Sequence, residues 1–321
     1  MSIKELIDSA IISVAKQPKN NTVDINKLGD KKLLLFPIDH DYPGGSAAMH
    51  NAVFSAFELN NRSAFIVADP KDTEQIVAAF RSDPTYIGGG AGSGFKDKIG
   101  PFLDRLDQSA KAIGSVNVIA KEDGQLVGYN TDGIGFVNGL LNEYSNCIKG
   151  KKIVVLGAGG TALPICYEMS QHQPSEIVIA NRTVAKAEAI AKMILPFCNA
   201  RGVGEEQIGR ELEAADIVVN TSNKGAQPNE LFSAFAPMTG DVDGDMAVGI
   251  ANLAKLPSSS ILADILLEED TLTMSMAREK GNPTHSGRHM NLFQAVPAFK
   301  IMTKLFDRND QDILEIMKKA I

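Results

Sequence analysis

The segment VLGAGGTA at residues 155–162 constrains the fold of this chain more than any other part of the sequence. It follows an apolar run and opens a helical pattern, which is the arrangement of a strand, a tight turn and a helix. In the spacing G-x-G-x-x-A, Gly157 permits the turn, Gly159 lets a pyrophosphate approach the backbone, and Ala162 lets the helix pack closely on the strand. Free N–H groups at the helix start would then meet the phosphate charge. The segment predicts a dinucleotide site rather than a plain structural turn, with these cofactor-binding residues: Gly157, Ala158, Gly159, Gly160 and Thr161.

The residues after the second strand of this unit favour NADP over NAD. Asn181, Arg182 and Thr183 stand where NAD-preferring folds usually carry an acidic residue for the ribose hydroxyls. Arg182 can donate charge-assisted hydrogen bonds to a 2′-phosphate, and Lys186 can add a second positive charge. Alternatively, both cations are solvated at the start of a helix. We predict that NADP is the cofactor and that these four residues bind it, with NAD less favoured.

The order of strand and helix patterns predicts an α/β protein with two domains. In the first part, strands at 31–38 and 62–68 alternate with helices at 47–60 and 73–81, which indicates parallel strands. The Gly-rich stretch at 86–96 is interpreted as an active-site loop rather than a linker, because FKDKIGPFLDRL then resumes a helical pattern. From Lys151 onward, a βαβ unit and further strands in ADIVVNTS and ILADIL predict a Rossmann-type, doubly wound domain. A helix with Pro297 follows near the C-terminus.

Composition narrows the classes of partner. The chain has 44% hydrophobic and 22% charged residues, typical of a folded protein, and its net charge of −7 argues against a nucleic-acid partner. Three scattered cysteines favour neither a disulfide framework nor a zinc site, so we expect a reducing, cytoplasmic location. Apolar residues between Ile3 and Val14 recur at helical spacing, which predicts an amphipathic helix rather than a signal peptide. No apolar run reaches the roughly 20 residues that cross a bilayer, so no membrane partner is expected.

Four ordered motifs resemble the shikimate dehydrogenase family, which includes quinate/shikimate dehydrogenases. They are GSVNVI at 114–119, GYNTDGIGF at 128–136, VLGAGGTA at 155–162 and IANRTVAKA at 179–187. The resemblance extends from about Leu33 to the C-terminus. It implies three parts: a substrate-binding α/β domain with an N-terminal helical extension at 1–131, a Rossmann-type NADP-binding domain at 132–284, and C-terminal helices at 285–321 that return to the first domain. A cleft between the domains would hold the site, and a homodimer is a candidate assembly.

The resemblance also implies the chemistry and its residues. Lys96 and Asp132 correspond to the family's catalytic pair, and Lys98 is the wrong-register alternative. A positioned acid/base group serves both directions of alcohol oxidation, because proton transfer accompanies hydride transfer each way. Alternatively, Asp132 only caps the following helix. The implied ligands are Ser46, Asn117 and Gln294 for the substrate and Gly287 for the cofactor, whereas His40 and His50 are expected to be structural.

Three departures from the family pattern bear on the substrate. Gly44 stands at the first serine of the family's S-x-S-P motif, and Gly90 and Gly92 replace the asparagine and threonine of its N-V-T-x-P-x-K loop. Leu267 stands roughly where a tyrosine is common. Because lost polar contacts can change specificity by powers of ten, we predict that shikimate is used poorly.

The function predicted from the sequence is the NADP-dependent interconversion of a ring ketone and a secondary alcohol, of the 3-dehydroshikimate/shikimate type. One alternative is a divergent paralogue that acts on quinate or a related cyclic hydroxy acid. Another is a non-catalytic NADP(H)-binding regulatory protein, against which the joint presence of Lys96, Asp132, Asn117 and Gln294 argues.

Overall fold

The computed structural model describes residues 2–16, 31–41, 45–226, 228–266, 270–287 and 290–321. The chain divides into two compact units. Residues 1–131 and 294–321 form one, here called the discontinuous unit, and residues 132–293 form the other, the continuous unit. Each unit contains a β-sheet with helices, which confirms the expected α/β class.

Within the described residues, the discontinuous unit has a mixed sheet with the strand order β1-β3-β2-β4-β6-β7-β5. Strands β2, β3 and β4 are parallel, as expected, but β1 is antiparallel to β3, and β6 is antiparallel to both β4 and β7. The tight turn between β6 and β7 is Asp123-Gly124, both with positive φ, a sequence typical of hairpins. The strands are β1 Ile12–Val14, β2 Lys32–Ile38, β3 Asn61–Ala68, β4 Tyr86–Gly90, β5 Arg105–Leu106, β6 Val118–Glu122 and β7 Gln125–Tyr129.

The helices of the discontinuous unit come from both ends of the chain. Phe299 of α11 lies 5.6 Å from the ring of His50 and 5.3 Å from that of Phe54, measured between centroids, so the C-terminal segment completes this core. The α-helices are α1 Ile3–Asp8, α2 Ser46–Ala56, α3 Thr73–Ser82, α4 Gln108–Ile113, α11 Met290–Thr303 and α12 Asp310–Lys318, with 3-10 turns at η2 Pro70–Asp72 and η3 Gly100–Phe102. The first four residues of α11 belong to the continuous unit.

Two helix expectations in this unit are wrong. The N-terminal helix stops at Asp8, because Ala10 has a φ of 58° and residues 12–14 pair with β3 as a strand. The segment at 95–106 forms turns, η3 and β5 instead of a helix. Pro101 lies in η3, and a proline cannot donate the hydrogen bond that a continuing helix requires.

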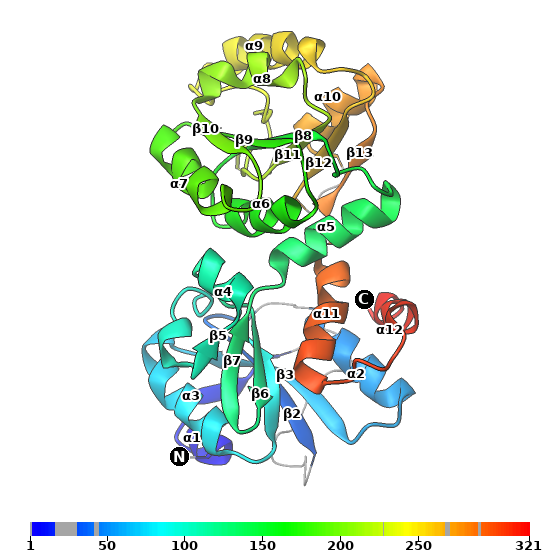
Figure 1. Cartoon of the computed structure of the whole chain (residues 1–321). Helices are drawn as coiled ribbons and strands as arrows, with labels where there is room; N and C mark the ends of the chain where they lie inside the picture. Colours follow the sequence, from blue (N-terminus) through cyan, green and yellow to red (C-terminus); the bar gives the residue numbers. More distant parts are fainter. Residues whose placement is uncertain (1, 17–30, 42–44, 227, 267–269, 288–289) are drawn as a thin grey trace. The chain divides into compact units, whose positions relative to one another are not determined.

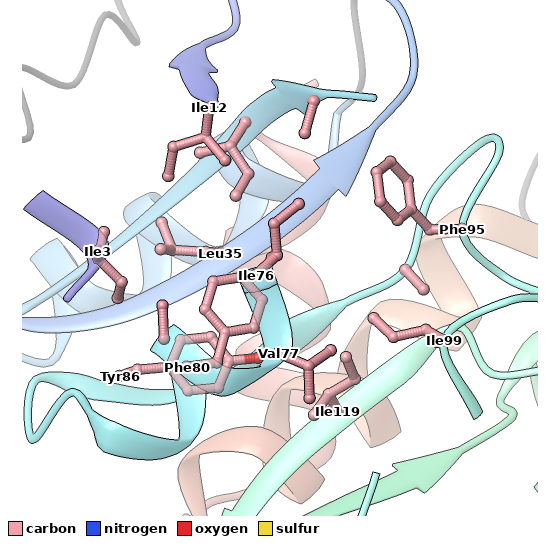
Figure 2. Close-up of a cluster of buried hydrophobic side chains, with 14 of the residues drawn as sticks. Ile3, Ile12, Leu35, Ile76, Val77, Phe80, Tyr86, Phe95, Ile99 and Ile119 are labelled. Atoms are coloured by element: carbon pink, nitrogen blue, oxygen red, sulfur yellow. The ribbon is translucent and has the colours of Figure 1, made fainter. Parts of the chain in front are cut away.

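The N-terminal segment is part of the core and not an appendage. Ile3, Leu6 and Ile12 are buried, and Figure 2 shows Ile3 and Ile12 in the same cluster as Leu35 and Phe80. Strand β1 also covers the edge of β3, which would otherwise present unpaired backbone groups. At its end, the N–H of residue 16 donates to the carboxylate of Asp41, in the connection between β2 and α2.

Replacing Leu6 with alanine is therefore expected to destabilise the protein. Its side chain is fully buried, and leucine-to-alanine changes in cores cost about 2–5 kcal/mol. We expect a loss in that range in the free energy of unfolding by urea, whereas Lys4→Ala, on the exposed side of α1, should change it by less than about 0.5 kcal/mol. A loss below about 1 kcal/mol for Leu6→Ala would contradict the core role of this segment.

The continuous unit has a parallel sheet in the order β10-β9-β8-β11-β12-β13 within the described residues. The strands are β8 Lys152–Leu156, β9 Glu176–Ala180, β10 Ala200–Val203, β11 Ile217–Asn220, β12 Ile261–Asp264 and β13 Thr284–His285. The helices are α5 Asp132–Glu143, α6 Ala162–Gln171, α7 Val184–Ile194, α8 Ile208–Leu212, α9 Val242–Lys255 and α10 Leu272–Lys280, with a 3-10 turn at η4 Glu205–Gln207. Figure 1 shows α6 and α7 on one face of the sheet and α8, α9 and α10 on the other.

This strand order reverses direction between β8 and β11, because the chain first moves from β8 to β9 and β10 and then crosses back to β11. It is the order of a dinucleotide-binding Rossmann fold, in which the cofactor binds outside the carboxyl ends of the strands at the reversal. The fold therefore places the expected ligand site at the ends of β8, β9, β11 and β12.

Candidate functional site

A pocket of about 540 Å³ lies at those strand ends in the continuous unit. Segments that follow four strands contribute to it, namely β8, β9, β11 and β12. Its lining residues are Gly157, Ala158, Gly159, Thr161, Asn181, Arg182, Thr183, Lys186, Thr221, Ser222, Asn223, Ile265 and Leu266. The glycine turn and the two cations singled out in the sequence thus share one cavity.

Glycine is needed at the positions of this turn for different reasons. Gly157 has a φ of +112°, and a Cβ there would lie 3.0 Å from the N of Ser222, so the protein itself requires glycine. A Cβ on Gly159 would come no closer than 3.9 Å to its neighbours, and one on Gly160 would have no neighbour within 4 Å. Both are exposed. The surrounding protein does not explain glycine at 159, whereas a pyrophosphate against the backbone would explain it, so the turn fits the cofactor.

Asn181 joins the glycine turn to the cationic turn. Its Oδ1 accepts from the N–H of Ala158 at 3.1 Å, and its Nδ2 donates to the carbonyl of Thr183 at 2.9 Å. Arg182 and Lys186 are exposed on the rim. A single side chain therefore sets the spacing between the backbone at 158 and the residues expected to meet a 2′-phosphate.

Two of the expected cofactor ligands do not line the pocket. Gly160 belongs to the same turn but faces open space. Gly287 follows β13, and a Cβ there would lie 2.2 Å from the carbonyl oxygen of Ile265. The structure thus gives Gly287 a packing role against a residue that does line the pocket.

The sequence reasoning missed the five lining residues after β11 and β12. Thr221, Ser222 and Asn223 follow β11, and Ile265 and Leu266 follow β12. Both strands were recognised, and ligands bind at the carboxyl ends of strands in this fold, so the signal was available.

Lys96 lies in the discontinuous unit, in the loop after β4. Its carbonyl accepts from the N–H of Val116 at 2.9 Å, and the N–H of Ala91 donates to the carbonyl of Asn117 at 3.1 Å, so this loop lies along the segment that leads to Asn117. Lys96 lines two cavities, of about 290 and 380 Å³, whereas Lys98 lines the first alone and is more exposed. These contacts favour Lys96 over Lys98 as the functional lysine.

The glycine replacements in this loop are tightly packed rather than open. A Cβ on Gly90 would lie 2.5 Å from the carbonyl oxygen of Asn117, and one on Gly92 would lie 2.4 Å from Cγ2 of Ile38. Gly94 has a φ of +78°, which a proline cannot adopt, and a Cβ there would meet the carboxylate of Asp39. The backbone and Ile38 therefore fill the space in which the missing asparagine and threonine side chains would begin.

Gly92→Thr alone is expected to destabilise the protein, because Ile38 is fully buried and cannot withdraw its β-branched methyl. Overpacking of this kind costs about 1–3 kcal/mol, which corresponds to a lower midpoint of thermal unfolding. Gly92→Thr should lower the midpoint less when it is introduced into Ile38→Ala than when it is introduced into the parent, because the truncated side chain leaves room for the threonine. Equal midpoints for the parent and Gly92→Thr would contradict this packing and show that the loop can open. Shikimate turnover, measured with and without Gly92→Thr in the parent and in Ile38→Ala, then tests the missing hydroxyl.

Asn117 holds the residue that precedes Asp132. Its Oδ1 accepts from the N–H of Thr131 at 2.9 Å, and its Nδ2 donates to the hydroxyl of Thr131 at 3.1 Å. Asn130 is held as well, because its N–H donates to the hydroxyl of Ser109 and its Nδ2 to the carbonyl of Ser115. Asp132 is half-buried and is the first residue of α5. The structure thus brings Asn117 together with Asn130 and Thr131 of the NTDG segment, up to the residue before α5.

The other residues expected at the site divide as follows. Ser46 is the first residue of α2, and Gln294 is a half-buried residue of α11. His50 is buried between the rings of Phe36 and Phe299, and burial lowers its pKa to about 3, so the imidazole is neutral and structural. Gly44 and Leu267 lie outside the described residues.

The described part of the chain contains no group of three or more His, Cys, Asp or Glu side chains that could hold a metal ion. None of its helices combines the length and the apolar character that crossing a membrane requires.

Comparisons with known proteins agree on one family. The family model for shikimate / quinate 5-dehydrogenase matches residues 140–228, and the model for the shikimate dehydrogenase substrate binding domain matches residues 37–119. The shikimate dehydrogenase (NADP(+)) of Methanocaldococcus jannaschii is 32% identical over 294 residues, 90% of this chain and 94% of that protein. Its counterpart from Desulforamulus reducens is 31% identical over 273 residues, 84% of this chain and 87% of that protein.

A solved structure extends the likeness to the fold. The shikimate 5-dehydrogenase of Listeria monocytogenes, in complex with shikimate and NAD, is similar to this chain with a TM-score of 0.78. The two are 27% identical, and the match covers 90% of this chain and 97% of that one.

Proposed function

Because the chain belongs to the shikimate dehydrogenase family, we propose that its two units divide the work of an NADP-dependent dehydrogenase. The enzyme interconverts a ring ketone and a secondary alcohol of a shikimate-like cyclic hydroxy acid with NADP as cofactor. The pocket of the continuous unit carries the proposal, since one cavity joins the glycine turn to Arg182 and Lys186. We propose that residues 132–284 bind the cofactor and that residues 1–131, with the helices of 285–321, bind the substrate.

In the continuous unit, we propose that the residues of the pocket bind and orient NADP. The backbone around Gly157 and Gly159 would receive the pyrophosphate, and Arg182 and Lys186 would bind the 2′-phosphate that distinguishes NADP from NAD. NADP supplies the hydride acceptor for the alcohol, and NADPH supplies the hydride for the ketone. Asn181 keeps the two phosphate-binding turns at a fixed spacing.

In the substrate half, we propose that Lys96 moves the proton of the reacting hydroxyl at its Nζ. One group suffices for both directions, because a proton leaves the hydroxyl in oxidation and returns to the carbonyl oxygen in reduction. Asp132 would be the anionic partner that orients this ammonium, as the family resemblance implies, and Asn117 holds Thr131, the residue before it. Ser46, Asn117 and Gln294 would contact the substrate's polar groups, since hydroxyls and amides can donate and accept.

The packing of Gly90 and Gly92 bears on the choice of substrate. The family's amide and hydroxyl at these positions are absent here, and protein atoms fill the space. We therefore keep the prediction that shikimate is used poorly, with quinate or a related cyclic acid as the alternative.

The test is a turnover screen. The purified chain is incubated with shikimate or quinate and with NADP or NAD, and the absorbance of the reduced nicotinamide is followed. We expect turnover with NADP and at least one cyclic hydroxy acid. Binding of NADPH without turnover of any of them would instead favour the regulatory alternative.

We also propose that the protein is cytoplasmic and forms a homodimer. The three cysteines are free thiols, which supports a reducing cytoplasm. The proposed assembly is a homodimer, and light scattering of the purified chain tests it, since a monomeric mass would exclude the dimer.

A further inference from the structure

A buried amide–carboxylate pair joins the ends of β11 and β12. Asn220 and Asp264 are the last residues of these strands, lie opposite each other in the parallel register, and are both 0% exposed. The Nδ2 of Asn220 donates to Oδ2 of Asp264 at 3.1 Å. Buried polar groups are costly unless they are hydrogen-bonded, so the partners of this pair show what it holds in place.

The remaining polar atoms of Asn220 fix the loop that follows β11. Its Oδ1 accepts from the N–H of Ser222 at 2.9 Å and from the hydroxyl of Ser222 at 2.7 Å. Its Nδ2 also donates to the carbonyl of Lys224 at 3.2 Å. Thr221, Ser222 and Asn223 line the cofactor pocket, so this one side chain shapes a wall of that pocket.

Asp264 does the same for the loop after β12. Its Oδ1 accepts from the N–H of Leu266 at 3.0 Å, and its Oδ2 accepts from the hydroxyl of Thr271, also at 3.0 Å. Ile265 and Leu266 line the pocket, and Thr271 is the N-cap of α10. Carboxylate oxygens accept hydrogen bonds, which suits a position facing donors from Asn220, Leu266 and Thr271.

We infer that Asn220 and Asp264 are positioning residues for the cofactor: together they lock the two pocket walls that come from β11 and β12 to each other. This inference rests on the proposed function. Neither residue lines the pocket, and neither of these walls carries an expected ligand of the 2′-phosphate. The pair therefore governs affinity for the part of the molecule that NADP and NAD share, whereas Arg182 governs the choice between them.

An exchange of the two side chains tests this arrangement. In Asp264→Asn, the amide nitrogen must face either the N–H of Leu266 or the Nδ2 of Asn220, so two donors oppose each other. In Asn220→Asp, two carboxylates oppose each other in a buried place. In the double variant Asn220→Asp/Asp264→Asn, the pair re-forms with its direction reversed, and Ser222 keeps its acceptor. The carbonyl of Lys224 loses its donor, and the hydroxyl of Thr271, which now meets an amide N–H, accepts instead of donating.

The measurement is the Kd of NADPH and of NADH, from the fluorescence of the reduced nicotinamide, with thermal unfolding as the check that each variant is folded. We expect each single variant to raise both Kd values about tenfold and by the same factor, and the double variant to return to within about threefold of the parent. Unchanged Kd values in the single variants, or a double variant that binds no better than the worse of them, would overturn the inference.

Thr271 provides a milder variant should the exchanges fail to fold. Thr271→Val removes the hydroxyl that bonds Asp264 and caps α10, whereas Thr271→Ser retains it, and Thr271 is not itself a pocket-lining residue. We expect Thr271→Val to raise both Kd values about threefold and Thr271→Ser to leave them unchanged. Equal Kd values in the two variants would overturn the inference. Failure of the parent itself to bind NADPH would instead reject the proposed function.

Discussion

Lys96→Ala is expected to lower turnover of the best substrate by about 10²- to 10⁴-fold, the range that one acid/base group typically contributes. The affinity for NADPH should change less than about twofold, because Lys96 belongs to the discontinuous unit and the cofactor pocket to the continuous one. The measurement is kcat at saturating substrate together with a fluorescence titration of NADPH.

Lys98→Ala is the matched control, since it removes the same charge two residues away, from a more exposed side chain that lines the smaller of the two cavities. We expect it to retain turnover within about threefold of the parent, the scatter of surface substitutions. A drop of less than about threefold for Lys96→Ala, or an equal drop for both variants, would reject Lys96 as the acid/base group.

Arg182→Ala is expected to weaken NADP binding by about 10- to 100-fold, because hydrogen bonds to charged groups are worth about 1.5–3 kcal/mol. NAD carries no 2′-phosphate, so its Kd should stay within about twofold. Paired calorimetric titrations with both cofactors measure the change in preference.

Lys186→Ala tests the second cation on the same rim. A smaller loss is expected there, since lysine acts as a point charge without the planar fork of arginine. If Arg182→Ala weakened NADP and NAD equally, its role would be to shape the turn, and the assignment of the 2′-phosphate site would be wrong.

Local patterns carried much of the fold prediction. The strands at 31–38 and 62–68 and the βαβ unit around Gly157 were recognisable because their apolar periods and turn residues lie within a few positions of one another. The N-terminal helix failed because the partner that makes 12–14 a strand is β3, some fifty residues later. Spacing along one segment cannot reveal a partner of that kind.

The residues of the site also differ in whether a local sequence pattern or a contact between distant segments reveals them. The glycine turn and Arg182 could be named from spacing alone, whereas the need for glycine at position 92 depends on Ile38, which lies in a separate segment. Asn220 and Asp264 are 44 positions apart, and their pairing requires the register of β11 against β12. No motif expresses that register, so the hydrogen bond that joins the two pocket walls became visible only in three dimensions.

The discontinuous unit is made of residues 1–131 and 294–321, so its core can form completely only after the ribosome has synthesised the second segment. Phe54 and His50 emerge early, but Phe299, whose ring packs against both, is made some 245 residues later. The continuous unit has all its strands by then and can fold as a body of its own. We therefore expect the unit proposed to bind the substrate to complete its core last, after the cofactor pocket of the continuous unit has formed.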